Sequence, residues 1–289
     1  MVTSLLVWFA CAQAAPATGP RVIAIGDLHA DLDNALAALQ LAGVIDAEGS
    51  WAAGSATVVQ TGDTTDRGPD SRAILALMRR LSTEAQAAGG RLVPLLGNHE
   101  LMNLLGDWRY VHPGDIEAYG GEESRRAALA PNGEDGSWLR TLDAVAVVGD
   151  TVFAHGGVHP DHASGGVDAL NDAVRAAIAG DPDAVVLGPT GPLWYRGYVQ
   201  DPEEVACPTL DRALALLGAA RMVVGHTTRK DGRIASRCGG RLAVIDIGIA
   251  DHYGAHLGAW EARGVDARAL YPTGPVDLVD PDGVSATSR

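Results

Sequence analysis

Three short apolar stretches set the expected architecture of this chain: RVIAIGD at residues 21–27, ATVVQTGD at 56–63 and RLVPLLGNHE at 91–100. Each stretch is rich in aliphatic and β-branched residues, which is typical of a buried strand. The segments between them, DLDNALAALQLAG at 31–43 and SRAILALMRRLSTEAQAAGG at 71–90, have apolar residues at helical spacing and end in glycine. Alternating strands and helices in this order predict right-handed crossovers and a parallel sheet buried on both faces.

A segment of different composition follows the third predicted strand. Residues 101–140, called the insertion below, are rich in glycine, proline and charge and lack sustained periodicity. We expect them to form an inserted loop or a small helical cap beside a site. Strand-like runs resume at 144–157 and 221–227, which indicates a second sheet packed on the first. The pattern predicts one α/β domain over residues 21–272, followed by a C-terminal tail at 273–289.

The composition excludes several classes of protein. The 289 residues include 22 Lys and Arg against 36 Asp and Glu, for a formal net charge of −14. This balance argues against a nucleic-acid binder or a basic membrane-surface protein, because phosphate groups would be repelled. After the N-terminal leader no stretch reaches 18 consecutive apolar residues, so no membrane span is expected. Among the classes of protein considered, the composition is that of an acidic globular protein.

The N-terminus has the pattern of an export signal. Residues 1–15, MVTSLLVWFACAQAA, carry no charge, and an A-x-A pattern at 12–14 is typical of a signal-peptidase site. A signal peptide predicts a periplasmic or secreted protein, whereas a non-functional leader would leave the protein in the cytoplasm. The processed chain would keep Cys207 and Cys238, which predicts one disulfide closing a loop of about 30 residues. Two unrelated buried thiols are the alternative.

Five segments place metal-ligating residue types at the ends of predicted strands. They are GDLH with Asp27 and His29, GDTTDRG with Asp63, Asp66 and Arg67, GNHE with Asn98, His99 and Glu100, HGG with His155, and GHT with His226. Ligand sites of open α/β sheets form at the carboxyl ends of strands, so these loops can converge on one point. The D-x-H spacing predicts that Asp27 and His29 share one side of an extended strand end. Preceding glycines permit close backbone approach.

These residue types predict a pair of divalent cations. Carboxylate and amide oxygens together with imidazole nitrogens suit Mn, Fe or Zn, whereas a calcium site would be all oxygen. Six ligands with two carboxylates are too many for one tetrahedral ion and suit two ions about 3.5–4 Å apart that share a carboxylate. Such a pair lowers the pKa of a bridging water from about 16 towards neutrality and so provides a hydroxide nucleophile. No Cys-x5-Arg loop is present, which excludes cysteine-phosphatase chemistry.

The ordered set GDLH, GDTTDRG, GNHE, HGG and GH resembles the calcineurin-like metallophosphoesterases of the phosphoprotein phosphatase family, over residues 22 to about 250. GNHELMNLLGDWRYV, GPLWYRG at 191–197 and VVGHT at 223–227 are similar to the bacterial Shewanella-like phosphatases. The departures are Ala30, where the family has glycine, and the lack of a SAPNYC segment, which weighs against Ser/Thr specificity. The resemblance implies two mixed β-sheets packed as a sandwich and flanked by helices.

The resemblance also implies a role for each site residue. Asp27 and His29 would bind the first metal, Asp63 would bridge both, and Asn98, His155 and His226 would complete the second site; these six are called the predicted ligands below. His99 would be the general acid that protonates the leaving oxygen, oriented by Asp66. Arg67, Arg196 and Asn98 would bind phosphate oxygens. Manganese is the expected metal, with Fe, Zn or Mg as alternatives.

The implied activity is a two-metal phosphomonoesterase that acts on phosphoproteins, with phosphotyrosine favoured, or on small phosphoesters. Hydrolysis of dinucleoside polyphosphates is an alternative, because that enzyme class is similar around GDxxxRGP and GNH. A non-catalytic metal-binding scaffold is a third, against which the intact His99 and Arg67 argue. Among the remaining candidates, Tyr253 either faces the phosphate or packs. Trp108, Arg109 and Tyr110 are interpreted as packing residues of the insertion, with contact to the substrate as the alternative. His112, His159, His162, His252 and His256 are interpreted as surface or hydrogen-bonded residues.

Overall fold

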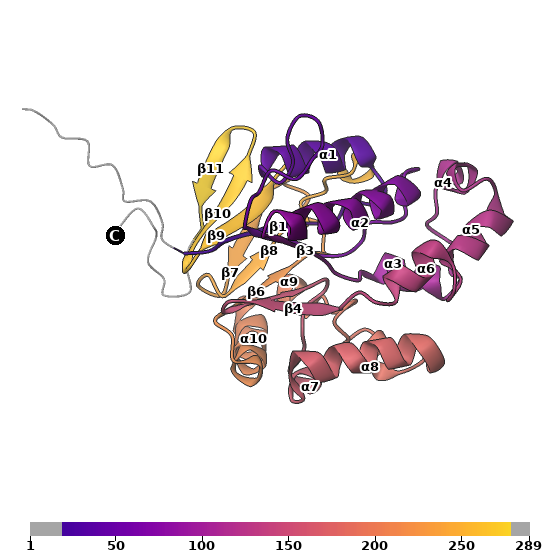
Figure 1. Ribbon diagram of the computed structural model, residues 1–289. Helices are drawn as coiled ribbons and strands as arrows, with labels where there is room; N and C mark the ends of the chain where they lie inside the picture. The colour runs from indigo at the N-terminus through magenta and orange to yellow at the C-terminus, as the bar shows by residue number, and fades with distance from the viewer. Residues whose placement is uncertain (1–18, 279–289) are drawn as a thin grey trace, which may run out of the picture.

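The computed structural model describes residues 19–278, so the predicted signal peptide at 1–15 lies outside the described residues. Two mixed sheets form the centre of the fold (Figure 1). The first has the order β11-β10-β9-β1-β2-β3, with β1 Arg21–Ile25, β2 Thr57–Gln60, β3 Arg91–Pro94, β9 Ala259–Arg263, β10 Asp266–Tyr271 and β11 Gly274–Asp277. The second has the order β4-β5-β6-β8-β7, with β4 Val145–Val148, β5 Thr151–Ala154, β6 Arg221–Val224, β7 Ala235–Arg237 and β8 Leu242–Val244.

The parallel core predicted from the first hundred residues is present. Strands β1, β2 and β3 pair in parallel, with Ile23 opposite Val58 and Val58 opposite Leu92. The crossovers are α1 Leu32–Leu41 and α2 Ser71–Ala87, which lie together over the first sheet in Figure 1. Helix α1 starts where Asp31 accepts a hydrogen bond from the backbone N–H of Asn34, which satisfies one of its free donors. Strand β9 adds antiparallel to β1 and makes the sheet mixed.

The two sheets pack face to face because the residues of the second sheet alternate between two apolar cores. In β6, Val223 belongs to the core shared with the first sheet, while Met222 and Val224 belong to a second core. Between the sheets, the rings of Phe153 and Trp260 meet edge to face at 5.7 Å. The second core is closed by α8 Gly166–Gly180 and α10 Glu203–Leu217. The predicted sandwich is therefore confirmed.

The insertion is helical. It contains most of α3 Asn98–Leu104, then α4 Pro113–Ala118, α5 Glu122–Leu129 and α6 Glu134–Leu139, which gather at one end of the sandwich in Figure 1. The remaining short elements are α7 Pro160–Ala163, α9 Gly197–Gln200 and the 3-10 turns η1 Val185–Leu187 and η2 Asp251–Tyr253. None of the helices in the described part of the chain combines the length and the apolar character that a bilayer crossing requires.

Part of the segment predicted as a tail, 273–289, is instead part of the first sheet. Gly274–Asp277 forms β11 and pairs antiparallel with β10, with Val276 opposite Ala269. The prediction was wrong there because a short polar strand is stabilised by its neighbour rather than by its own pattern. Residues 279–289 lie outside the described residues.

The predicted disulfide is confirmed. Cys207 on α10 is bonded to Cys238, just after β7, and their Cα atoms lie 5.4 Å apart. The bond fixes α10 to the edge of the second sheet.

Candidate active site

The predicted ligands meet at the carboxyl ends of five strands. Strands β1, β2, β3, β5 and β6 end within four residues of Asp27, Asp63, Asn98, His155 and His226, respectively. Each of the six predicted ligands is at most 5% exposed. Strands from both sheets therefore deliver polar side chains to one buried point, as expected for the open edge of parallel strands.

Asp27 and His29 lie together as predicted, but the prediction that they sit on one side of an extended strand end is wrong. Strand β1 ends at Ile25, and His29 has a left-handed backbone with φ 45°. The turn, rather than the alternation of an extended strand, brings the His29 Nε2 atom to 3.9 Å from Asp27 Oδ2. A residue of this kind in the left-handed region is uncommon and is held by surrounding hydrogen bonds. Here the N–H groups of Leu28 and His29 both donate to the Asp63 carbonyl at 2.9 Å.

Two glycines are required by the close approach of the loops. A Cβ atom on Gly97 would collide with the Asp63 carboxylate, and one on Gly225 would collide with the Asp27 carboxylate. These glycines thus let the backbone before Asn98 and His226 come up against the two acidic side chains.

Asp63 lies at the centre of the site. One carboxylate oxygen, Oδ2, is 3.7 Å from His29 Nε2, and the other, Oδ1, is 3.3 Å from His155 Nε2. Asn98 Oδ1 is 2.9 Å from the same His155 nitrogen. Two of the candidate metal-binding groups among the described residues lie here, His29 with Asp63 and His99, and Asp63 with His155 and His226, with donor atoms within 4.8 Å of one another. Asp63 belongs to both, so its carboxylate lies between two candidate ion positions.

The histidine hydrogen bonds test whether these residues fit cations. One ring nitrogen of each faces a backbone carbonyl: His29 Nδ1 at 3.4 Å from Thr65 O, His155 Nδ1 at 2.8 Å from Thr61 O and His226 Nε2 at 3.2 Å from Trp194 O. Because a carbonyl only accepts, these nitrogens carry the protons. The other nitrogen of His29 and of His155, Nε2 in each ring, then turns a lone pair towards the Asp63 carboxylate, whereas His226 Nδ1 lies 3.5 Å from Arg196 Nη2. Lone pairs and carboxylates that face one another repel unless a cation lies between them, so the donor set fits divalent metal ions.

The pKa shifts of the buried carboxylates and imidazoles also indicate that the site fits cations. Burial lowers the pKa of His29 to about 3 and that of His226 to about 2, so both rings are neutral at physiological pH. Burial and the nearby Asp246 and Asp63 raise the pKa of Asp27 well above its ordinary value. Burial opposes ionisation of Asp63 too, but the imidazoles of His155 and His99 hold its pKa well below the ordinary value. Two buried carboxylates this close require positive charge to be ionised together.

His99 and Asp66 form a hydrogen-bonded pair beside the predicted ligands. The Nδ1 atom of His99 lies 2.7 Å from Asp66 Oδ2, and its Nε2 atom lies 3.8 Å from Asp63 Oδ2. Burial lowers the pKa of His99, but the carboxylates of Asp63 and Asp66 outweigh this and raise it above the ordinary value. A protonated imidazole can therefore be held at the mouth of the site.

Glu100, quoted above without a role, supports the turn that carries Asp63. Its carboxylate accepts hydrogen bonds from the backbone N–H groups of Gly97, Asp63, Thr64 and Thr65 at 2.7–3.0 Å. Asp246 is a second buried acidic residue of the site that was not predicted. Like Asp27, it comes just after a buried strand, and this position in the sequence could have identified it. It is buried beside Asp27, and Gly248 N–H donates to its Oδ1.

Two arginines flank the centre. The Arg67 guanidinium stacks on the Tyr110 ring at 3.9 Å and lies 5.9 Å from the Tyr253 ring, and its Nε has no hydrogen-bond partner among the described residues. Tyr110 also lies 5.2 Å from the His99 ring. Arg196 donates to the His226 carbonyl at 2.8 Å. Tyr253 and Tyr110 thus lie beside the site, where Tyr110 packs against Arg67 and His99.

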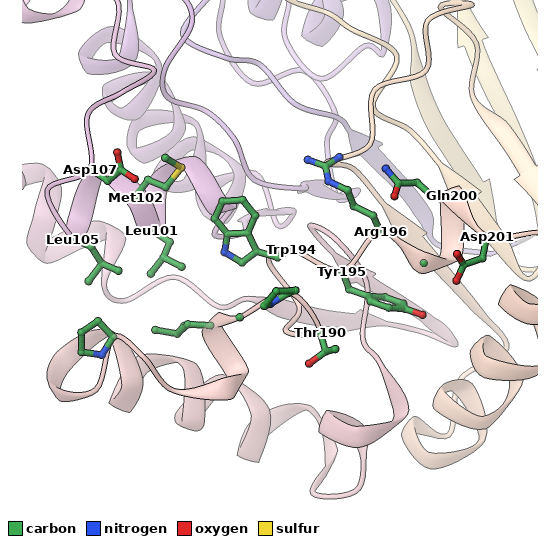
Figure 2. Close-up of a pocket in the computed structure, with 15 residues that line it drawn as sticks. Leu101, Met102, Leu105, Asp107, Thr190, Trp194, Tyr195, Arg196, Gln200 and Asp201 are labelled. Atoms are coloured by element: carbon green, nitrogen blue, oxygen red, sulfur yellow. The ribbon is translucent and has the colours of Figure 1, made fainter.

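A largely apolar pocket of about 720 Å³ opens beside the site (Figure 2). Leu101 and Met102 of α3 and Leu105, which directly follows α3, line it on one side. Trp194, Tyr195 and Arg196 line it on the other side, as Figure 2 shows. The pocket adjoins the predicted ligands because α3 begins at Asn98 and the Trp194 ring lies 5.9 Å from His226.

The remaining histidines do not join this site. His112 and His159 cap α4 and α7 by accepting hydrogen bonds from Gly114 N–H and Asp161 N–H, and His252 is exposed. Their interpretation as surface or hydrogen-bonded residues agrees with these positions.

Comparison with known proteins places this geometry in a family. The family model of the calcineurin-like phosphoesterases matches residues 20–229. The chain is 40% identical over 246 residues to an uncharacterised protein of Schizosaccharomyces pombe, covering 80% of this chain and 74% of that protein. It is 32% identical over 280 residues to Shewanella-like protein phosphatase 2 of Arabidopsis thaliana, covering 80% and 71% of the two chains.

A solved structure has the same fold. The cold-active protein-tyrosine phosphatase of a psychrophilic Shewanella species superposes with a TM-score of 0.79 at 29% identity, over 92% of this chain and 83% of that one. The chain therefore belongs to the calcineurin-like phosphoesterase family and is a metal-dependent phosphatase.

Proposed function

We propose that the protein is a two-metal phosphomonoesterase that removes phosphate from phosphoproteins, with a preference for phosphotyrosine. The observation that carries the proposal is the position of the Asp63 carboxylate in two groups of metal-ligating side chains, next to the hydrogen-bonded pair of His99 and Asp66. Asp27 and Asn98 lie against the histidines of these groups. Shewanella-like protein phosphatases and a protein-tyrosine phosphatase among the similar proteins support the substrate class.

In this proposal the predicted ligands hold two divalent ions. Asp27, His29 and Asp63 bind the first ion, and Asp63 with Asn98, His155 and His226 binds the second. When bound, the ions supply Lewis acidity and lower the pKa of water, which suits attack on phosphorus. Manganese is proposed because the ligand set mixes nitrogen and oxygen donors, to which Fe, Zn and Mg also bind.

His99 is the proposed general acid. As the bond between phosphorus and the ester oxygen breaks, that oxygen keeps the electron pair and takes the proton of His99 Nε2. The Nδ1–H group of His99 donates to Asp66 Oδ2, 2.7 Å from Nδ1, which fixes the ring and favours the imidazolium that gives up the Nε2 proton. Proton transfer from a positioned acid contributes about 10²–10⁴-fold to the rate.

Arg67, Arg196 and Asn98 are the proposed phosphate-binding residues. The unpaired Nε of Arg67 can donate to a phosphate oxygen, and stacking on Tyr110 holds the guanidinium plane in place. The proposed preference for phosphotyrosine is supported by the Tyr110 and Tyr253 rings, which wall the space around Arg67 beside the acid, where the leaving group must lie. A planar phenyl ring can pack against such walls.

The apolar pocket in Figure 2 supports a polypeptide substrate. It adjoins the predicted ligands, and Leu105 at its wall is 44% exposed, so side chains that flank a phosphorylated residue can be buried there. We also propose that the protein is exported, for which the A-x-A pattern at residues 12–14 and the disulfide are the support.

The test is a substrate panel on metal-free protein reloaded with Mn, Fe, Zn or Mg. The proposal expects phosphate release that depends on added metal and is faster from phosphotyrosine than from phosphoserine peptides. Faster hydrolysis of diadenosine tetraphosphate would favour the dinucleoside alternative, and no turnover on any substrate would favour the scaffold. The Asp63→Asn protein is the control, because it should lose metal and activity together.

A further inference from the structure

A chain of short buried hydrogen bonds runs from the insertion to the acid. Arg125 on α5 is 1% exposed; its Nε donates to Asp115 Oδ2 at 2.8 Å and its Nη2 to Asn103 Oδ1 at 2.7 Å. The Nδ2 group of Asn103 donates to Asp66 Oδ1 and to the His99 carbonyl, both at 2.8 Å. Asp66 in turn holds His99 Nδ1 through its other oxygen.

Arg125 on one side, and the Asp66 carboxylate and the His99 carbonyl on the other, fix which way the Asn103 amide points. An amide can offer either its oxygen or its NH2 group in a given direction, whereas a guanidinium only donates. The oxygen of Asn103 must therefore face Arg125, and the NH2 group must face Asp66. This occupies Asp66 Oδ1 and leaves Oδ2 for the Nδ1–H of His99, so that Nε2 faces the predicted ligands.

The surroundings hold this arrangement rigidly. Asp115, Asn103 and Asp66 are at most 2% exposed, so the hydrogen bonds do not exchange freely with water. Asp115 also accepts from the backbone N–H of Ser71 at 3.0 Å, and the Arg125 guanidinium stacks on Trp108 at 4.8 Å. A planar fork with two acceptors and an aromatic support has one orientation.

We propose that Arg125 is a positioning residue for catalysis. It orients Asn103 and, through Asn103, the carboxylate of Asp66, so that the proton on His99 Nε2 is directed at the leaving oxygen. The inference rests on the proposed function of His99 as the acid. It gives the helical insertion a part in the reaction, which its sequence pattern did not indicate.

The test compares leaving groups that need a proton to different degrees. The p-nitrophenolate anion is stable without one, whereas the phenol of tyrosine has a pKa of about 10 and leaves faster when it is protonated. Arg125→Lys keeps a positive charge beside Asp115 but cannot bind two acceptors as a fork. We expect kcat on a phosphotyrosine peptide to fall about 10–100-fold and kcat on p-nitrophenyl phosphate to fall less than about threefold. KM and bound manganese should stay unchanged.

Two further variants make the result decisive. Arg126→Ala removes the neighbouring exposed guanidinium, which also stacks on Trp108 but does not reach Asn103, and it should leave both rates unchanged. Asn103→Leu removes the amide and keeps the ion pair of Arg125 with Asp115, so it decides the matter if Arg125→Lys fails to fold by circular dichroism. Equal losses on both substrates, or no loss on either, would overturn the positioning role.

The same experiment separates this inference from the proposed function. Wild-type protein that releases phosphate from neither substrate in the presence of manganese would refute the proposed function itself. An active wild type whose variants lose both activities in parallel would refute the positioning role alone.

Discussion

Replacing Glu100 by glutamine changes one carboxylate oxygen into an NH2 group without changing the shape of the side chain. In the wild type, Oε2 accepts from the N–H groups of Gly97 and Asp63 at 2.7 and 2.8 Å, and Oε1 accepts from those of Thr64 and Thr65 at 2.8 and 3.0 Å. An amide has one oxygen, so either orientation places its NH2 group against two buried backbone donors.

The expected cost follows from these two donors. Each buried N–H left without an acceptor costs about 1–3 kcal/mol, so Glu100→Gln should lower the free energy of unfolding by about 2–6 kcal/mol. The turn that Glu100 supports contains left-handed residues, Asp63 at φ 55° and Asp66 at φ 67°, which are strained and relax when the hydrogen bonds are lost. Movement of Asp63 should also weaken metal binding.

Urea denaturation at fixed pH measures the stability, and metal analysis after gel filtration measures the bound manganese. Glu117→Gln is the matched control, because Glu117 is exposed on the insertion and its replacement should change stability by less than about 0.5 kcal/mol. A Glu100→Gln protein as stable as the control, with full metal content, would refute the supporting role of Glu100.

Three further predictions test the acid and the disulfide. His99→Asn should keep its metal but lose about 10²–10⁴-fold in kcat, as phosphotyrosine kinetics will show; a wild-type rate would mean that the acid is misassigned. Because the acid must be protonated, kcat should fall as the pH rises through the pKa of His99. Burial lowers this pKa, but Asp63 and Asp66 raise it above the ordinary value. In Asp66→Asn the fall in kcat should therefore begin at lower pH, and an unshifted pH profile would contradict this. The disulfide joins Cys207 and Cys238, whose sequence separation is 31, so its reduction should lower the free energy of unfolding by about 3–4 kcal/mol. The midpoint of thermal unfolding should fall with it, and an unchanged midpoint would contradict the expectation.

Much of the fold could be predicted because its strongest patterns are local. The stretches at 21–27, 56–63 and 91–100 are buried on both faces, so their apolar character shows without any partner. Strand β11 could not be found in this way, because Gly274–Asp277 carries mostly exposed residues and depends on its pairing with β10.

The site was predictable to the extent that it follows strand ends. Asp27 and His155 come just after short apolar runs, and the topology brings such positions together. The local geometry was less accessible, as the left-handed turn at His29 shows. Arg125 could not be found at all, since its role depends on how α5 folds back onto Asn103, which no local pattern encodes.

The most direct test of the account is a crystal structure of manganese-loaded protein with anomalous scattering measured at the Mn edge. The account predicts two peaks about 3.5–4 Å apart, with the Asp63 carboxylate between them. A single peak, or ions bound away from Asp63, would contradict it.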